Sequence, residues 1–254
     1  RSVKAIEVDV TPHATTRPRV PKIETNGFVS PMQRYPELKR SDWDNSWKRT
    51  ACVVTAEDGT WGFGLTLHSG VTVPLINDHI GPVIEGENCM ATERVWDLMQ
   101  KATAPYGTAG VSSFAISAVD NALWDLKGKL LNKPVYEIIG GPQKEKIFCY
   151  ASNTDLSYGT ENSIDWFLEL GFKAVKLFLR EGPDAGLAGL NRTEELVAKT
   201  REQVGPDVEI AVDCWMSMNT DYMVRLAEQL RPYRIKWLED YMLPEDLDSY
   251  FNLR

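Results

Sequence analysis

A chain of 254 residues with 43% apolar and 25% charged residues has an ordinary globular composition and can bury one large core or two smaller ones. Its net charge of -8 argues against a nucleic-acid partner, because binding a polyanion depends on clustered lysine and arginine. No apolar run approaches the length of a membrane span and no signal-peptide pattern opens the chain, so we expect no membrane partner and a cytoplasmic location. The cysteines at 52, 89, 149 and 214 form no C-x-x-C pair, which favours buried free thiols in a reducing compartment.

Strands are expected first along the chain, and helices after them. Apolar alternation predicts a strand over residues 3–10, and two further runs predict strands over 50–55 and 61–67. The Asp58-Gly59 turn between the last two predicts a hairpin. The polar and proline-rich segment Thr11–Asp44 is predicted to be a loop, and a loop of this length is usually functional or disordered.

Helices are predicted near 72–80 and 91–103, and the strongest helical pattern covers Ser112–Leu131. Ser112 or Ser113 is expected to cap this last helix, and Asn132 with Pro134 to end it. Its apolar residues recur at intervals of three and four and therefore share one face; they are Ile116, Val119, Leu123, Leu126 and Leu130. Gly140-Gly141-Pro142 then marks a boundary, so we expect one domain over residues 1–142 and another over 143–254.

After Pro142 the pattern alternates between strand and helix. Strands are expected over 147–151, 174–178, 208–213 and 235–239. Helices are expected over 163–170, from an Asn191/Glu194 capping box to Gly205, and along a face formed by Tyr222, Met223, Leu226, Ala227 and Leu230. This alternation is typical of a parallel sheet with right-handed crossovers. Because four such units are half of a (β/α) barrel, we expect the chain to stop within the fold.

Asp213 and Glu239 each stand where one of these apolar strands ends. Parallel strands of a barrel deliver their last residues to the same rim, so the two carboxylates are expected to meet there. Two adjacent carboxylates repel unless a cation lies between them, and their hard oxygens suit Mg²⁺. Taken singly, Asp213 is more simply a helix cap and Glu239 a surface acid. Spacing alone supports the metal site and these structural roles about equally.

Three other segments are candidates for contact with a ligand. Lys176 lies within an apolar strand, where an unpaired ammonium is costly to bury, so it should reach the rim and face a carboxylate or substrate. A lysine that extends to solvent fits the pattern equally well. His68 follows a strand and could touch a ligand, but a hydrogen-bonded surface histidine fits better. The glycine-rich segment 182–189 lacks the ending of a phosphate loop and is expected to be a flexible loop beside the rim.

The stretch Ala118-Val119-Asp120-Asn121-Ala122-Leu123-Trp124-Asp125-Leu126-Lys127-Gly128-Lys129, followed by Pro134-Val135-Tyr136 and Gly140-Gly141, resembles the hallmark of the enolase superfamily. The segments around Asp213 and Glu239 resemble that family's first two Mg²⁺ ligands, and Ser30-Pro31-Met32 resembles its acid-sugar dehydratase branch. The resemblance covers essentially the whole chain. It implies an α/β fold in which an N-terminal α+β capping domain over 1–142 precedes the first half of a modified TIM barrel over 143–254.

The resemblance also implies a Mg²⁺-dependent hydro-lyase that removes water from an acid sugar through a metal-stabilised enediolate, and a homo-oligomer. Asp213 and Glu239 would hold the metal, Lys176 would act as a supporting cation, and Trp215 and His68 would contact the substrate. The 11–44 loop would close over it. Position 178 is Phe, whereas many members of the family have at this position a Lys that acts as the catalytic base. This departure fits a group whose base is a His assisted by an Asp on later strands, where the third metal ligand is also expected.

Two other interpretations stay open. Another acid-sugar dehydratase or a racemase would share the first proton abstraction, and a non-catalytic relative would keep the fold for assembly or ligand binding. The mass of the product separates dehydration from epimerisation, because only dehydration loses water. A third carboxylate and a strand-end His on the later strands would separate the catalytic relatives from the non-catalytic one.

Overall fold

The computed structural model describes residues 2–8, 29–31, 48–152 and 160–253, which fall into two compact units. Of the described residues, the first unit holds 2–8 and 48–145, and the second holds 29–31 and those from 146 onward. Each unit buries an apolar core of its own. Within these ranges every helix is too short or too polar to span a lipid bilayer.

The first unit is built on an antiparallel sheet with the order β1-β2-β3, formed by β1 (Ser2–Val8), β2 (Arg49–Thr55) and β3 (Trp61–Thr66). The predicted hairpin is confirmed: Gly59 adopts a φ of 89°, and the Ala56 nitrogen donates to the Thr60 carbonyl at 2.8 Å. The first predicted strand is confirmed over 2–8, and residues 9 and 10 lie outside the described residues.

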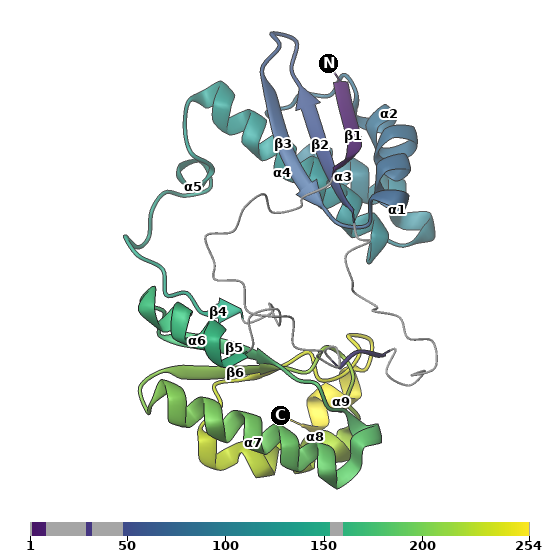
Figure 1. Ribbon diagram of the computed structural model, residues 1–254. Coiled ribbons are helices and arrows are strands. Elements are labelled where there is room, and N and C mark those ends of the chain that lie inside the picture. Colours follow the sequence, from purple (N-terminus) through teal and green to yellow (C-terminus); the bar gives the residue numbers. More distant parts are fainter. Residues whose placement is uncertain (1, 9–28, 32–47, 153–159, 254) are drawn as a thin grey trace. The chain divides into compact units, whose positions relative to one another are not determined.

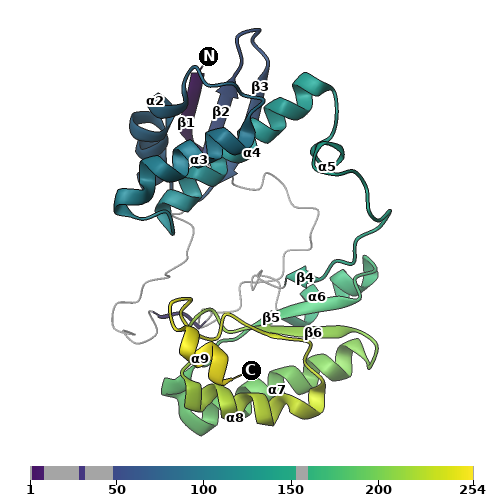
Figure 2. The same cartoon turned by 180° about the vertical axis from the view of Figure 1, so that it is seen from behind.

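Helices cover one face of this sheet (Figures 1 and 2). They are α1 (Ser69–Pro74), a π-helical turn (Leu75–Ile80), α2 (Gly81–Ile84), α3 (Thr92–Thr103), a 3-10 turn (Ala104–Tyr106) and α4 (Val111–Leu131). The short α5 (Val135–Ile138) follows α4 and lies away from the sheet. The helices predicted near 72–80 and 91–103 are therefore confirmed, the first as part of a longer helical stretch. The α4 helix packs directly on β3 because Gly62 and Gly64 face it without side chains.

The predicted apolar face of α4 is confirmed, because Ile116, Val119, Leu123 and Leu126 are buried. The predicted serine cap is wrong. Gly110 precedes the helix with a φ of 67°, no side chain caps it, and Ser112 is already buried inside the first turn. The predicted end is confirmed at Asn132, whose φ of 50° stops the helix in the left-handed conformation that asparagine tolerates.

The second unit contains a parallel sheet with the order β4-β5-β6-β7, as the alternation predicts. Its strands are β4 (Ala151–Ser152), β5 (Ala174–Phe178), β6 (Glu209–Asp213) and β7 (Leu238–Glu239). The strand predicted over 147–151 is wrong before Ala151: Ile147 is 80% exposed, and pairing with β5 starts at Ala151. The last strand is also shorter than predicted, because the chain leaves a 3-10 turn at Arg234 with a φ of 52°.

The helices of the second unit are α6 (Thr160–Glu169), a 3-10 turn (Pro183–Ala185), α7 (Gly186–Val204), α8 (Thr220–Leu230), a second 3-10 turn (Arg231–Tyr233) and α9 (Leu247–Asn252). The predicted capping box is wrong, because Asn191 and Glu194 lie inside α7. Their oxygens accept hydrogen bonds from Gln229 Nε2 at 3.2 and 2.6 Å, so they tie α7 to α8. The flexible loop predicted over 182–189 is wrong as well, because α7 has already begun at Gly186 and Gly189 lies buried against Tyr222.

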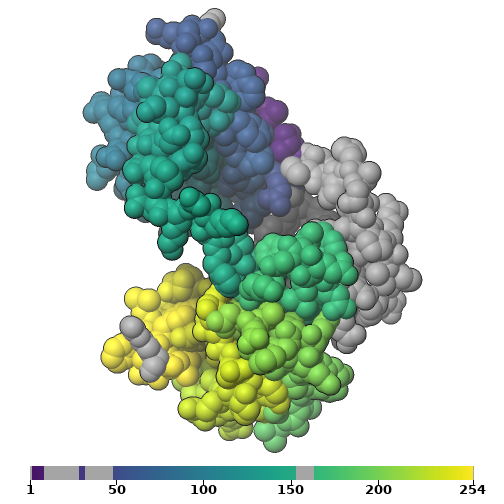
Figure 3. Space-filling view, turned by 90° about the vertical axis from the view of Figure 1, so that its left-hand side faces the viewer, coloured from purple at the N-terminus to yellow at the C-terminus, as the bar shows by residue number. Residues whose placement is uncertain are grey.

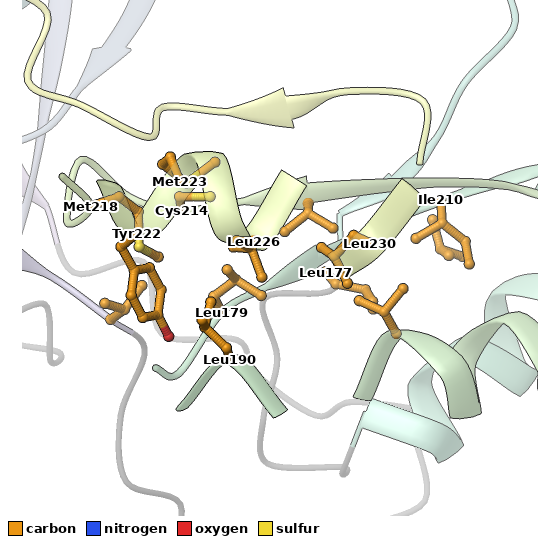
Figure 4. Packing of buried hydrophobic residues seen from close by; sticks show 14 of the residues in the cluster. Leu177, Leu179, Leu190, Ile210, Cys214, Met218, Tyr222, Met223, Leu226 and Leu230 are labelled. Carbon is orange, nitrogen blue, oxygen red and sulfur yellow. The ribbon is translucent and has the colours of Figure 1, made fainter. Parts of the chain in front are cut away.

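The second core joins side chains of the sheet to those of α7 and α8. Figure 4 shows Leu177 of β5 near Leu226 and Leu230 of α8, and Leu179 near Leu190 of α7; Ile210 of β6 belongs to the same cluster. In the space-filling view, the green to yellow residues of this unit form one continuous body (Figure 3). The buried face of α8 is the one predicted, with Tyr222, Met223, Leu226 and Leu230 inside. A layer of helices thus packs against the strands that carry the candidate site.

Candidate metal centre

Three neighbouring strands bring Lys176, Asp213 and Glu239 together. Asp213 is the last residue of β6 and pairs directly with Glu239, the last residue of β7. On its other side Asp213 pairs with Phe178 at the end of β5, two residues beyond Lys176. The two carboxylates therefore meet at the carboxyl edge of the sheet, where active sites of parallel α/β folds are built.

The ammonium of Lys176 lies between the two carboxylates. Its Nζ is 3.1 Å from Asp213 Oδ2 and 2.8 Å from Glu239 Oε1. The Lys176 and Asp213 side chains are only 9% and 6% exposed. Lys176 therefore faces the carboxylates and does not extend to solvent.

Neutral donors hold the other carboxylate oxygens. The Trp215 backbone nitrogen donates to Asp213 Oδ1 at 3.0 Å, and Trp237 Nε1 donates to Glu239 Oε2 at 2.9 Å. Each carboxylate thus has one oxygen oriented by a tryptophan and one turned to Lys176. Because an ionised carboxylate offers about four acceptor positions, these contacts still leave capacity for a cation.

Burial and the shared ammonium move the pKa values of the three groups in different directions. Burial raises the pKa of Asp213 and outweighs the Trp215 and Lys176 contacts that lower it. Burial acts the same way on the less buried Glu239, but there Lys176 and Trp237 prevail, so its pKa is lowered. Burial would lower the pKa of Lys176, yet its contacts with Glu239 and Asp213 raise it. Lys176 therefore remains an ammonium at neutral pH.

A third carboxylate, which the sequence analysis missed, stands beside the pair. Asp240 follows Glu239, and oxygens of Asp213, Glu239 and Asp240 lie within 4.8 Å of one another. The adjacent acids in Leu238-Glu239-Asp240 are a signal that could have found it. Three carboxylates and one ammonium give a cluster with a formal charge of about −2, which suits a divalent cation.

The chain around the cluster adopts conformations that non-glycine residues rarely take. Trp215, Met216 and Asp240 have φ values of 46°, 58° and 46°. The Met216 nitrogen donates to the Asp240 carbonyl, and Met218 donates to Tyr241 at 3.0 Å, so the two strand extensions stay paired beyond the sheet. Left-handed residues of this kind often mark functional sites.

Of the two predicted substrate contacts, Trp215 belongs to this edge and His68 to the first unit. The Trp215 ring is half-buried, 5.7 Å from the Phe178 ring. His68 precedes α1 in a left-handed conformation and contacts the Phe114 ring edge-on at 4.9 Å. Both assignments stay predictions.

Most of the predicted 11–44 loop lies outside the described residues, apart from Val29, Ser30 and Pro31. Val29 is 1% exposed and donates to the carbonyl of Leu179, the residue after β5. In turn Leu179 donates to the Asp213 carbonyl at 3.1 Å. The described part of this loop is thus attached to the edge of the sheet that carries the carboxylates.

This combination of an α+β unit and a parallel α/β unit with acids at its strand ends defines a class of protein. The chain belongs to the enolase superfamily: residues 47–140 match the mandelate racemase / muconate lactonizing enzyme N-terminal domain. Residues 161–254 match the enolase C-terminal domain-like family. The fold class and the family predicted from the sequence are therefore confirmed.

Among individual relatives, the chain is similar to L-rhamnonate dehydratases. It is 39% identical over 229 residues to L-rhamnonate dehydratase of Saccharopolyspora erythraea, a match that covers 89% of this chain and 57% of the relative. A putative L-rhamnonate dehydratase of Caldivirga maquilingensis is 36% identical and covers 88% of the chain and 55% of the relative. The chain thus spans a little over half the length of these relatives.

The chain is also similar to solved structures. A crystal structure of rhamnonate dehydratase from Gibberella zeae complexed with Mg superimposes with a TM-score of 0.83 at 27% identity, covering 100% of this chain and 62% of that one. A racemase from Streptomyces coelicolor with bound magnesium gives a TM-score of 0.74 at 27% identity, covering 82% and 62%.

Proposed function

We propose that this protein is a Mg²⁺-dependent dehydratase of an acid sugar, which converts L-rhamnonate to 2-keto-3-deoxy-L-rhamnonate. The observation that carries the proposal is the pair Asp213 and Glu239, placed side by side at the ends of β6 and β7. The similarity to L-rhamnonate dehydratases supports the substrate. In this proposal residues 1–142 form the capping domain and residues 143–254 the beginning of the barrel.

The donor set fits Mg²⁺. Its side chains are carboxylates, which are the hard oxygen ligands this ion prefers, and the ammonium of Lys176 already occupies a position favourable to a cation. Asp213 and Glu239 would hold the ion, with Asp240 as a further carboxylate within reach. When bound, the ion would supply a Lewis acid that stabilises negative charge on the substrate carboxylate as the α-proton is removed.

The chain's own residues prepare the ligands for this task. Trp215 and Trp237 each orient one carboxylate through a single hydrogen bond, which fixes the direction of the remaining lone pairs. Lys176 adds a buried positive charge beside the two proposed metal ligands, so it would lower the cost of gathering negative charge at this edge of the sheet. Trp215 and His68 are proposed to contact the substrate.

The direct test combines a substrate panel with one variant. Full-length protein with Mg²⁺ is incubated with L-rhamnonate and other sugar acids, and the product mass is measured. We expect a 2-keto acid that is one water lighter than its substrate. Asp213→Asn keeps the shape but removes a ligand charge, so it should lower kcat/KM by about 100-fold or more and abolish Mg²⁺ binding by calorimetry.

Asp221→Asn is the matched control, because Asp221 is an exposed residue of α8 paired only with Arg225 among the described residues. It should leave activity and metal binding unchanged. Loss of the same activity in both variants, or dehydration by Asp213→Asn at the wild-type rate, would contradict the assignment.

A racemase or epimerase is the second candidate, favoured by the similarity to the magnesium-bound racemase of Streptomyces coelicolor. In that case the same incubation would give a product of unchanged mass with exchange of one substrate hydrogen for deuterium from D₂O. Another acid-sugar dehydratase would lose water from a different member of the panel, and a non-catalytic relative would bind Mg²⁺ and convert none.

Two attributes complete the proposal: a cytoplasmic location and a homo-oligomeric state. The cysteines support the first, because Cys52, Cys89, Cys149 and Cys214 all carry free thiols. The second follows from the family and is tested by sedimentation.

A further inference from the structure

Lys176 contacts the same carboxylates that the proposed function assigns to the metal. We propose that its ammonium is a resident counter-ion, which holds Asp213 and Glu239 together while no metal is bound and competes with the metal for them. The inference rests on the proposed metal site. It adds that Lys176 sets the affinity of this site for its ion.

The first support is that Lys176 contacts the carboxylate oxygens that face a common point. Trp215 and Trp237 hold Asp213 Oδ1 and Glu239 Oε2, and the opposite oxygens, Oδ2 and Oε1, both lie within 3.1 Å of Lys176 Nζ. A cation shared by the two acids needs oxygens that face a common point, and Lys176 marks that point. The ammonium and the metal therefore draw on the same lone pairs.

The second support is that Lys176 is fixed in place. Its side chain is 9% exposed, and its Nζ lies 5.0 Å from the centre of the Phe178 ring and 5.6 Å from that of Tyr150. Aromatic faces attract a cation at these distances. The strand pairing that aligns Phe178 with Asp213 also fixes the Lys176 backbone opposite Ala211. The ammonium cannot leave the acids for solvent without losing these contacts.

The third support is electrostatic. Without Lys176, the buried Asp213 and the half-buried Glu239 would face each other with uncompensated like charges, which destabilises the metal-free fold. With Lys176 present, a divalent ion that arrives between them meets a positive charge a few ångströms away. Lys176 thus stabilises the metal-free state and penalises the metal-bound state, and both effects weaken metal affinity.

The test compares full-length wild type with Lys176→Met, which keeps the length of the side chain and removes its charge. Both proteins are stripped with a chelator and titrated with Mg²⁺ by calorimetry, and thermal unfolding is followed with and without the ion. We expect Lys176→Met to bind Mg²⁺ about tenfold more tightly or better. Its metal-free midpoint should fall, and Mg²⁺ should raise that midpoint more than in wild type.

Lys173→Met is the matched control, because Lys173 is exposed just before β5 and carries the same charge. Both its affinity and its midpoint should equal those of wild type. If Lys176→Met does not fold, Lys176→Gln replaces it, since glutamine is neutral but still donates hydrogen bonds, and it too should bind Mg²⁺ more tightly.

Equal or weaker Mg²⁺ binding in the neutral variants would overturn the inference, as would the absence of binding in every protein. The proposed function and the counter-ion role can be refuted independently of each other. If Mg²⁺ binding shifts as expected but no acid sugar is converted, the counter-ion role stands and the dehydratase assignment falls. If wild type dehydrates a sugar acid and Lys176→Met binds Mg²⁺ with unchanged affinity, only the counter-ion role falls.

Discussion

Replacing Gly64 with alanine tests the close packing of α4 on β3. A β-carbon at position 64 would overlap the carbonyl oxygen of Ala118 and come within 3.0 Å of the Ala118 carbonyl carbon and the Ala122 nitrogen. All three are backbone atoms of one helix, so no flexible side chain can turn away. The helix must therefore shift away from the sheet, although its residues Ala118 and Ala122 are both 0% exposed in the core.

Overpacking of a well-filled core costs about 1–3 kcal/mol, and a backbone clash belongs at the upper end or beyond it. We therefore expect Gly64→Ala to lose about 3 kcal/mol of unfolding free energy. For a chain of this size that corresponds to a midpoint roughly 6–12 °C lower. Thermal unfolding followed by circular dichroism, with urea titration for the free energy, measures both.

Gly70→Ala is the matched control within the same unit. Gly70 lies in α1, and a β-carbon there would meet no atom within 4 Å. Because alanine favours a helix over glycine by roughly 1 kcal/mol, this variant should equal wild type or gain slightly. A Gly64→Ala protein that unfolds at the wild-type temperature would show that α4 does not approach the strand as described.

Two further predictions concern the buried cysteines and the hydrogen bonds that Arg201 donates to backbone carbonyls. With a maleimide at pH 8, the exposed Cys149 should react in the native protein. Cys52, whose pKa is raised by burial to about 12, and the buried Cys214 should react only after unfolding. Mass mapping of the labelled peptides checks this, and labelling of Cys52 in the native state would contradict it. Arg201→Lys should lower the unfolding free energy by about 2 kcal/mol, because lysine cannot donate as the guanidinium does to the carbonyls of Gly205, Val208 and Tyr233.

The control for Arg201→Lys is Arg225→Lys, since Arg225 is 56% exposed and forms a surface pair with Asp221. An equal loss of stability in both variants would contradict a special role for Arg201. The denaturant slopes should stay the same in all three proteins, because neither change alters the area buried on folding.

Local patterns in the sequence were sufficient for the regular parts of the fold. The hairpin follows from Asp58-Gly59 between two apolar runs, and α8 follows from apolar residues at helical spacing. The meeting of Asp213 and Glu239 follows from parallel topology, because both end consecutive strands. In each case a short-range pattern and the long-range packing favour the same outcome.

Elsewhere the deciding partner is distant in sequence. Asn191 and Glu194 have the spacing of a capping box, but their partner Gln229 lies on the next helix, so only the packed structure explains them. Met216 adopts a left-handed conformation, which the sequence does not predict because the residue is not a glycine. The position of Lys176 between two acids likewise depends on three strands at once, which is why the sequence left an exposed lysine as an equal alternative.

Phe178, Asp213 and Glu239 stand in one hydrogen-bonded row across three strands. Since side chains alternate between the faces of a sheet, a slip of one residue along β6 would bring the apolar Val212 into this row and turn the acid to the opposite face. Insertions in the loops that join strands to helices carry no such penalty, because the ladder fixes the row whatever the length of these loops. The lengths of these loops can therefore vary while the row of acids keeps its place.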